Sequence, residues 1–530
     1  MRIGGYYQLA FVALLWALAT SGARAADRED GNGRSVQELT AICDRLNGQT
    51  FEEVTIRSTR RFESGAQTPV GFCRLLATRP PYLDIEVDVP DNWSGRLLHQ
   101  GGAGLDGYLP AGVSIAADGS IAHVSTAISQ KAAIYVASNG GNRADVSAEA
   151  APAVWASGTA SGRASAEDYA YRSLGTTIIF AKQVAKQFYG KVPNYTYFNG
   201  CSNGGRNAYI AAERWPGEYD GIVAGCETMD MAGQTAMWLN LGSKAGTAAA
   251  LRPAQYSAAF SAALKACDAE DGIADGVMAR PIACKFDPAT LKCPSSSANT
   301  DSSACLSVVQ VATLRDLLSP LISQNGATLY AGYSWADFGV PGPGGSISRA
   351  FGMLGGVNAF LATGDTSWLT PQKQATFTAA RDYQSLRAGQ LARGMGHNLA
   401  AIAAYVESGK KLLSWHVSSD NLLSPKDHAR NFAAMTRLAQ SKGLVDPRAD
   451  ARLFIVPAAQ HGAGARFEEV DWLSAIIDWV EDSKPPTQLV YSFSTHGVIR
   501  TIPVCEYPSY PRYKGHGDQN SAGSFVCTLP

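Results

Sequence analysis

Short runs of β-branched and aromatic residues alternate with longer helical stretches over about residues 35–225. The runs that read as strands are 82–89, 96–100, 134–138, 195–199 and 221–224. The segment 167–188 has apolar residues three and four positions apart and is followed by Gly190, so it is predicted to be a helix. This alternation is typical of βαβ units and predicts a largely parallel sheet.

The pattern changes between about residues 228 and 398, where Ala- and Gly-rich helical pieces replace the strands. Strand-like runs return at 411–416 and 453–457, and an amphipathic helix is predicted at 468–481. The sequence therefore predicts an α/β core in two parts, 26–228 and 399–530, separated by an insertion at 229–398.

The N-terminus has the features of an export signal. Arg2 precedes an apolar run at 9–19, and Ala23, Arg24 and Ala25 supply a small-x-small cleavage pattern. A membrane anchor is the alternative, but eleven apolar residues fall short of the roughly 20 that cross a bilayer. We therefore expect residues 1–25 to be removed.

Composition narrows the class of protein. Hydrophobic residues make up 46% of the 530 residues and charged residues 17%, which provides enough apolar material for a large core and excludes a disordered tail. The net charge of −1 gives no general attraction to nucleic acid or to an anionic membrane. All ten Cys follow the signal, an even number that is consistent with five bridges in an oxidising compartment, either the periplasm or the outside of the cell.

A candidate nucleophile lies at Ser202. The sequence Gly200-Cys201-Ser202-Asn203-Gly204 follows the predicted strand 195–199 and precedes an Ala-rich helical stretch. Strand, G-x-S-x-G turn and helix in this order form the nucleophile elbow of α/β-hydrolases, where small neighbours are needed because the backbone passes close to itself. A bare G-x-S-x-G also occurs as an ordinary glycine-rich turn, and the flanking elements favour the elbow.

A serine nucleophile needs a base and an acid, which follow it along the chain in this fold. His461 comes after the strand 453–457 and before the last long helix, which is the expected place of the base. His416 ends a strand but comes too early, and it reads as a hydrogen-bonded interior residue. His496 and His516 lie in the C-terminal tail and are expected at the surface. Asp420, in the loop after the strand 411–416, is the expected acid.

Two backbone N–H groups are needed to bind the oxyanion of a tetrahedral intermediate. Asn203, directly after the predicted nucleophile, would supply one of them. The glycine-rich segment that follows the strand 96–100 would supply the other, from Gly102 or from Gly101. The alternative is a simple glycine turn.

An acidic loop lies in the insertion, where Asp268, Asp271 and Asp275 are spaced around glycines. Hard oxygen ligands in a short kinked loop suit Ca²⁺, with the carbonyls of Ile273 and Val277 as further ligands. The spacing is not that of an EF-hand, and an acidic surface loop is the alternative. We expect a structural rather than a catalytic ion.

These motifs together resemble the tannase and feruloyl esterase family over most of the mature chain. The most specific matches are the segments 92–96, 197–206, 219–225, 268–277, 505–508 and 513–518. The resemblance implies an α/β-hydrolase core, a lid domain inserted after residue 225 that would cover the acyl group, a Ca²⁺ in that lid, and hydrolysis of esters of aromatic acids. It also implies Ser202 as nucleophile, Asp420 as acid and His461 as base.

The cysteines depart from the pattern of that family at one point. The family pairs the Cys before the nucleophile with a Cys after the catalytic His, but Gly462 follows His461 here. Family-like bridges remain for four pairs: Cys43 with Cys73, Cys267 with Cys284, Cys293 with Cys305, and Cys505 with Cys527. The two remaining residues, Cys201 and Cys226, are predicted to pair with each other.

The sequence thus predicts an exported serine esterase that acts on small aromatic or phenolic esters. Two alternatives stay open on the residues alone. An amidase or exopeptidase could use the same triad, because the triad does not choose between ester and amide. A catalytically silent, calcium-stabilised binding protein could retain the elbow without the catalytic geometry.

Overall fold

The computed structural model describes residues 33–65, 68–117, 121–143, 150–227, 229–294, 305–335, 347–495 and 497–530. The predicted export signal and His496 lie outside these residues. None of the helices within the described ranges is long and apolar enough to cross a bilayer.

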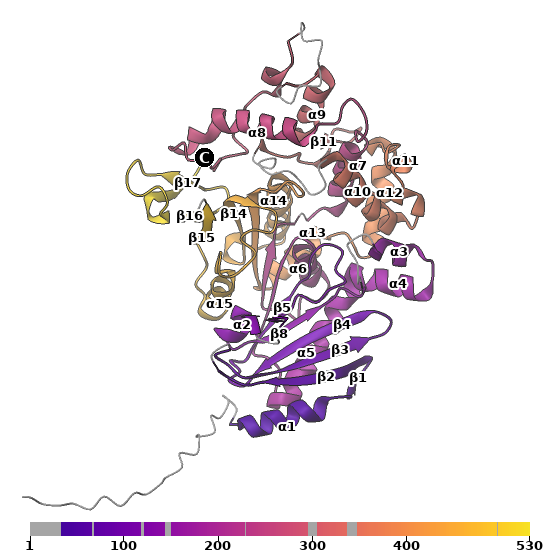
Figure 1. Ribbon diagram of the computed structural model, residues 1–530, viewed down its shortest axis with the longest axis vertical. Coiled ribbons are helices and arrows are strands. Elements are labelled where there is room, and N and C mark those ends of the chain that lie inside the picture. The colour runs from indigo at the N-terminus through magenta and orange to yellow at the C-terminus, as the bar shows by residue number, and fades with distance from the viewer. Residues whose placement is uncertain are drawn as a thin grey trace, which may run out of the picture.

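The described residues form one large sheet of twelve strands (Figure 1). From one edge to the other the strands are β1 (Thr50–Phe51), β2 (Val54–Phe62), β3 (Phe72–Arg79), β4 (Leu83–Pro90), β8 (Ile134–Ser138), β5 (Arg96–Gln100), β9 (Tyr195–Cys201), β10 (Gly221–Gly225), β13 (Lys411–Ser419), β14 (Ala451–Gln460), β16 (Val498–Glu506) and β15 (Gln488–Thr495). The six central strands from β8 to β14 are parallel, and the strands at both edges pair antiparallel.

Both faces of the central sheet are covered by helices. One face carries α1 (Val36–Leu46), α5 (Ser173–Tyr189), α6 (Asn203–Arg214), α13 (Leu399–Glu407) and α14 (Pro425–Ser441), and the other carries α2 (Thr126–Ser129) and α15 (Trp472–Asp482). Successive strand residues alternate between these faces. In β10, Ile222 and Ala224 belong to the first apolar core and Val223 to the second. Such two-sided burial explains the nearly continuous apolar runs of the predicted strands.

Two helices begin at residues other than those predicted from the sequence. The helix predicted at 167–188 is the later part of a longer run: α4 (Ala160–Glu167), a π-helical turn at Asp168–Arg172, and then α5. The run begins earlier because the Thr159 side chain accepts the N–H of Gly162 and caps α4. It ends at Gly190 in the left-handed conformation, as predicted. The helix predicted at 468–481 begins only at Trp472, where Asp471 caps it.

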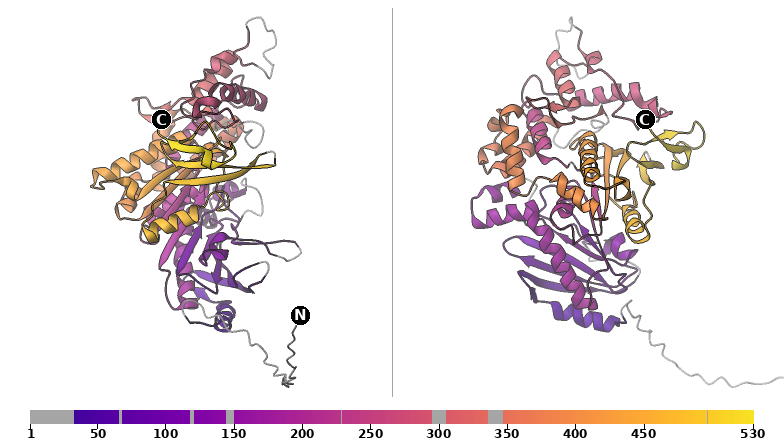
Figure 2. Two further views of the ribbon diagram at one scale, coloured as in Figure 1. Left: turned by 90° about the vertical axis from the view of Figure 1, so that its left-hand side faces the viewer. Right: turned by 180° about the vertical axis from the view of Figure 1, so that it is seen from behind.

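The insertion forms a helical layer at the end of the molecule opposite α1 (Figures 1 and 2). Its described elements are α7 (Met231–Gly242), α8 (Pro253–Cys267), η2 (Asp268–Asp271), η3 (Pro288–Leu291), α9 (Val308–Leu318), β11 (Leu321–Ile322), β12 (Thr328–Tyr330), α10 (Ile347–Thr363), η5 (Thr366–Leu369), α11 (Pro371–Gln374) and α12 (Ala379–Ala392). Two apolar clusters hold this layer, and both include core residues. Leu423 belongs to one of them and Tyr169 to the other, so the insertion is packed onto the core.

The remaining described elements are short. They are the hairpin of β6 (Val113–Ile115) and β7 (Ile121–Val124), helix α3 (Ala150–Ala156), the turn η6 (Pro447–Ala449), and the C-terminal hairpin of β17 (Tyr510–Tyr513) and β18 (Phe525–Thr528), with η7 (Ala522–Ser524). His516 is exposed in this C-terminal segment, as expected.

Five disulfides join all ten cysteines, in the pairings expected from the sequence. Four of them are the family-like bridges. The fifth joins Cys201, the last residue of β9, to Cys226, directly after the neighbouring strand β10, with their Cα atoms 5.1 Å apart. Disulfides in this number are typical of proteins outside the reducing cytosol.

Candidate active site

Ser202 occupies a sharp turn between β9 and α6. Its backbone has φ 61° and ψ −124°, a conformation that side-chain-bearing residues rarely adopt. The turn is possible because its neighbours lack side chains: a Cβ on Gly200 would lie 2.3 Å from the Gly204 carbonyl oxygen. This geometry is that of the predicted nucleophile elbow.

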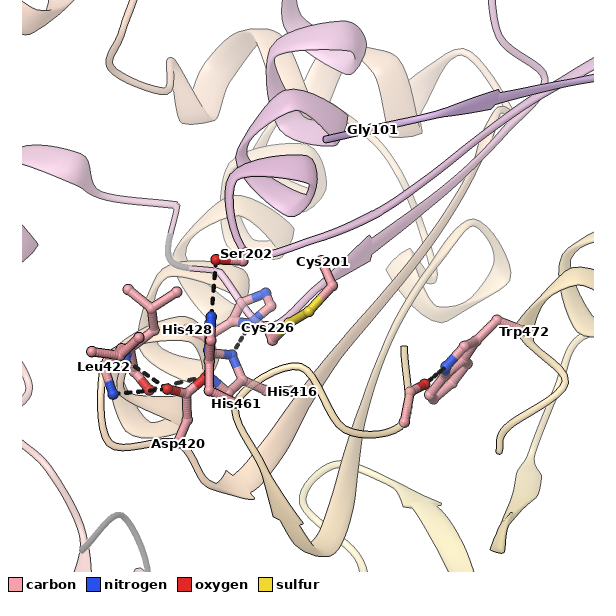
Figure 3. Close-up of a disulfide and its surroundings, with 12 residues drawn as sticks. Gly101, Cys201, Ser202, Cys226, His416, Asp420, Leu422, His428, His461 and Trp472 are labelled. Atoms are coloured by element: carbon pink, nitrogen blue, oxygen red, sulfur yellow. Dashed lines mark hydrogen bonds and ion pairs between the residues drawn. A yellow bond between two sulfur atoms is a disulfide. The ribbon is translucent and has the colours of Figure 1, made fainter. Parts of the chain in front are cut away.

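His461 lies between Ser202 and Asp420 (Figure 3). Its Nε2 is 2.9 Å from the Ser202 hydroxyl oxygen, and its Nδ1 is 2.6 Å from Oδ2 of Asp420. The histidine follows β14 and the aspartate follows β13, so two neighbouring parallel strands deliver both side chains to the same edge of the sheet. Three residues spread over a stretch of 259 positions in the chain thus form one hydrogen-bonded row.

Asp420 and His461 each stabilise the charged form of the other. Burial opposes ionisation of Asp420, but the His461 charge and hydrogen bonds from His416 and His461 outweigh it and lower the pKa of Asp420 below its usual value. Burial likewise opposes the protonation of His461, yet the charge and hydrogen bond of Asp420 raise the pKa of His461 above its usual value. A histidine made more basic in this way can accept the proton of a serine hydroxyl.

The insertion holds the loop that follows Asp420. Oδ1 of Asp420 accepts the N–H groups of Leu422 and Leu423, both at 2.9 Å. The Leu422 carbonyl in turn accepts the Trp238 indole N–H at 3.0 Å and the Tyr333 hydroxyl at 2.7 Å. The insertion therefore fixes the backbone that orients the carboxylate.

The glycine-rich segment after β5 packs against the start of α6. The Gly101 N–H donates to the Asn199 carbonyl at 2.8 Å, so it is already used. Among the described residues, the N–H groups of Gly102 and Asn203 make no hydrogen bond. Asn203 opens α6, where an N–H has no partner within the helix. Gly102 rather than Gly101 thus has a donor to offer.

Asp106 also belongs to this region, and no motif in the sequence marks it. Its Oδ1 accepts the side-chain N–H of Asn203, and its backbone has φ 52°. Burial raises the pKa of Asp106 to about 7, against the hydrogen bond from Asn203 and the charge of Arg206. This carboxyl therefore ties the glycine-rich segment to the residue after Ser202.

A cavity of about 500 Å³ opens over Ser202 and His461. Its apolar walls come from five residues, Tyr108, Pro110, Trp415, Leu422 and Ala465, and its polar wall from the backbone of the glycine-rich segment and from Gln100. Its size lies within the range of small-molecule sites. Each of its described lining residues belongs to the core, whereas the resemblance implies that the insertion covers the acyl group.

The disulfide between Cys201 and Cys226 lies beside the elbow (Figure 3). Cys226 follows β10, and its N–H donates to the Trp415 carbonyl of β13 at 2.9 Å. The bridge therefore joins the nucleophile strand to the next strand of the sheet. It does not join the elbow to the loop of His461, in contrast to the pairing that the resemblance implies for the family.

The acidic loop packs against the C-terminal hairpin and does not line the cavity over Ser202. Burial, with the charges of Asp275 and Asp268, raises the pKa of Asp271 to about 7, against the hydrogen bond from the Ile273 N–H. Oδ1 of Asp268 is buried without a hydrogen-bond partner, and Asp275 pairs with Arg500. Within the described ranges, no three His, Cys, Asp or Glu side chains form a ready metal-binding group. The loop nevertheless offers the hard oxygen atoms that suit Ca²⁺.

The sequence interpretation missed the groups behind Asp420. His416 is fully buried, as the sequence predicts, but its Nε2 also lies 3.3 Å from Oδ2 of Asp420. Its Nδ1 meets Nδ1 of His428 on α14 at 2.8 Å. The strand position of His416 could have suggested this contact, since Asp420 lies only four residues further on.

Comparison with known proteins identifies the family. The sequence model of the family described as tannase and feruloyl esterase matches residues 69–528. The chain belongs to this family. It is accordingly an α/β-hydrolase and a carboxylic-ester hydrolase of the feruloyl esterase and tannase type. The open alternatives of an amidase and of a silent binding protein gain no support from these matches.

Relatives cover most of the chain. It is 29% identical over 518 residues to mono(2-hydroxyethyl) terephthalate hydrolase of Piscinibacter sakaiensis, covering 85% of this chain and 82% of that protein. It is 25% identical over 515 residues to feruloyl esterase B of Aspergillus niger, with 91% of each chain covered.

Solved structures share the fold. Feruloyl esterase B from Aspergillus oryzae superposes with a TM-score of 0.76 at 20% identity, covering 92% of this chain and 100% of that one. Tannin acyl hydrolase from Aspergillus niger gives 0.66 at 18% identity, covering 93% and 95%.

Proposed function

We propose that this protein is an exported serine esterase that hydrolyses esters of aromatic or phenolic acids, with Ser202, His461 and Asp420 as its catalytic triad. One observation carries the proposal: His461 reaches both Ser202 and Asp420 at the base of a cavity large enough for a small ester. The raised pKa of His461 fits a general base.

The reaction proceeds through an acyl-enzyme. The Ser202 oxygen attacks the ester carbonyl while His461 takes its proton, and Asp420 stabilises the imidazolium that forms. The N–H groups of Gly102 and Asn203 bind the oxyanion. His461 then protonates the departing alcohol, and a water molecule activated by the same histidine releases the acid.

The aromatic acyl group is inferred from the family and from the cavity. The relatives are named for feruloyl esters and for a terephthalate ester. The exposed ring of Tyr108, with Pro110, Leu422 and Ala465, forms apolar walls that suit a flat ring.

A panel of phenolic esters tests this function. Feruloyl, galloyl, chlorogenate and terephthalate half-esters would be compared with an aliphatic ester and with an anilide of the same acid. We expect turnover of at least one aromatic ester, none of the anilide, and stoichiometric labelling by a fluorophosphonate that Ser202→Ala abolishes. Ser129→Ala, at the end of α2, is a matched control that keeps full activity. Unchanged turnover by Ser202→Ala, or a preference for the aliphatic ester, would refute the proposal.

We also propose that the acidic loop holds a structural Ca²⁺ through Asp268, Asp271 and Asp275 and the carbonyls of Ile273 and Val277. Oδ1 of Asp268 is unpartnered, and burial together with the nearby charges of Asp275 and Asp268 raises the pKa of Asp271; both observations support a cation there. When bound, the ion would neutralise the carboxylates and join the loop to the C-terminal hairpin.

The metal proposal is tested by thermal unfolding with and without chelator. We expect chelation to lower the melting temperature and Ca²⁺ to restore it, with no such response in Asp271→Asn. An identical melting temperature in chelator and in millimolar Ca²⁺ would rule out the ion.

Export is the third part of the proposal. Five disulfides and the signal-like residues 1–25 support it. Cell fractionation, with N-terminal sequencing of the mature protein, distinguishes the periplasm from the medium. A cytosolic protein that retains residue 1 would contradict it.

A further inference from the structure

A chain of polar side chains is buried directly behind Asp420. Ser414 and His416 lie on β13, His428 lies on α14, and Tyr209 lies on α6. All four side chains are fully buried. Because burying a polar group without a partner is costly, the positions of their hydrogen atoms are constrained by their neighbours.

The direction of hydrogen bonding along these four side chains is set where His416 meets Asp420 (Figure 3). Nε2 of His416 lies 3.2 Å from the Leu423 carbonyl oxygen and 3.3 Å from Oδ2 of Asp420. A carbonyl and an ionised carboxylate only accept hydrogen bonds, so Nε2 must carry the hydrogen. In a neutral ring, Nδ1 of His416 is then an acceptor.

The remaining bonds follow from this first one. Nδ1 of His428, 2.8 Å from Nδ1 of His416, must donate, so Nε2 of His428 accepts from the Tyr209 hydroxyl. The Tyr209 oxygen accepts from the Ser414 hydroxyl at 2.9 Å. Burial lowers the pKa of His428 well below its usual value, in agreement with a neutral ring.

We propose that Ser414, Tyr209, His428 and His416 form a positioning chain in which each group donates to the next, so that His416 always presents an N–H to Asp420. This inference rests on the proposed function, in which Asp420 orients the base. None of the four groups touches the substrate in this scheme, and each acts through the carboxylate.

The chain completes the set of donors around Asp420. Oδ2 receives His461 and His416, while Oδ1 receives the N–H groups of Leu422 and Leu423. The carboxylate is thereby held in the orientation that points Nε2 of His461 at the nucleophile. Tyr209 lies on the helix that begins after Ser202, so the chain also joins the elbow to the acid loop.

Loss of the Tyr209 hydroxyl should break this order. His428 could then carry its hydrogen on Nε2, and its Nδ1 would face Nδ1 of His416 as a second acceptor. His416 would then have to carry its hydrogen on Nδ1, which faces His428. Its Nε2 could no longer donate to Asp420. The carboxylate would lose one donor although no atom near the substrate has changed.

Tyr209→Phe and Tyr219→Phe form a matched pair of variants. The Tyr219 hydroxyl lies 2.8 Å from Nδ1 of His99, and both residues are buried in the core away from Asp420. Each variant thus removes one buried bond between a tyrosine and a histidine, and Tyr209→Phe also removes the bond from Ser414. We expect kcat per titrated active site to fall roughly tenfold in Tyr209→Phe, as for one hydrogen bond, with KM within about twofold. Tyr219→Phe should keep the wild-type kcat although it also loses thermal stability.

A conservative replacement of His416 separates positioning from packing. His416→Gln places an amide N–H near the position of Nε2 and does not depend on a ring tautomer. We expect it to retain most of the wild-type kcat, and we expect Tyr209→Phe to have no further effect on kcat in this background.

Two results would overturn the proposal: equal kcat values for Tyr209→Phe and Tyr219→Phe, or a loss from Tyr209→Phe that is as large with Gln at position 416 as with His. Failure of the proposed function looks different, because the wild-type protein would then neither hydrolyse the aromatic esters nor label at Ser202.

Discussion

Gly204→Ala tests whether the glycine-rich segment and the elbow must touch through their backbones. A Cβ at position 204 would lie 2.6 Å from the Gly102 carbonyl oxygen and 3.2 Å from the Gly101 carbonyl carbon. Ordinary van der Waals contact begins near 3.4 Å, so the glycine-rich segment must move away from position 204 by about 0.8 Å (3.4 − 2.6). No flexible side chain can absorb this movement, since the opposing atoms are backbone.

The retreat moves one of the two proposed oxyanion donors and leaves Ser202 and its hydrogen bond to His461 in place. A misplacement of this size costs up to about a hundredfold in rate, comparable to the loss of one donor. We therefore expect kcat to fall about a hundredfold, or roughly 2.7 kcal/mol of transition-state stabilisation, with a small change in KM.

The assay is steady-state hydrolysis of an aromatic ester, with active sites titrated and the melting temperature recorded for each variant. Gly217→Ala is the control, because a Cβ there meets no atom within 4 Å. A kcat of Gly204→Ala within about threefold of the wild type, in a protein that melts normally, would refute the assignment of Gly102 to the oxyanion hole.

Three further outcomes are expected. Asp420→Asn should lower kcat by roughly 10⁴-fold. It should also move the acid limb of the kcat/KM profile to lower pH, because the charge of Asp420 raises the pKa of His461. An unmoved limb would contradict this. Replacing Cys201 and Cys226 together by Ala opens a loop of 25 residues and should lower the free energy of unfolding by about 3.5 kcal/mol in denaturant titrations, while a loss of activity without a loss of stability would show that the bridge serves the site instead. Asp106→Asn should melt at the same temperature as the wild type near pH 4 and at a higher temperature than the wild type above pH 7. The carboxyl of Asp106 keeps its proton to about pH 7 in the folded protein but ionises near pH 4 in the unfolded protein, so ionisation favours unfolding of the wild type alone. Melting temperatures of the two proteins that change in parallel with pH would contradict this.

Local patterns in the sequence were sufficient to predict the buried parallel strands of the core and the elbow at Ser202. The apolar runs of β5, β8 and β10 mark buried parallel strands because both faces of the sheet are covered. The segment around Ser202 identifies the elbow because only glycines tolerate the close backbone contacts on either side of it. Position in the chain selected His461 and Asp420, since the order of strands fixes which loops reach the edge beside Ser202.

Helix starts were less predictable. Position 167 looks like a helix start from its apolar spacing, yet the Thr159 cap begins the run earlier and a π-helical turn accommodates Asp168. Asp168 is fully buried beside Arg79 and Arg172, an arrangement that depends on a strand almost 90 residues away. A pattern confined to the helix cannot contain that information.

The sequence by itself determined where the central strands lie along the chain, the small residues of the elbow, and the number of cysteines available for pairing, because each depends on residues adjacent in the chain or on a repeating period. Only the tertiary structure decided that the Gly101 N–H is occupied while that of Gly102 has no partner, that Asp106 holds Asn203, and that Tyr209 and His428 stand behind Asp420. These contacts join separate elements, and hydrogen-bond direction and burial arise only once those elements pack together.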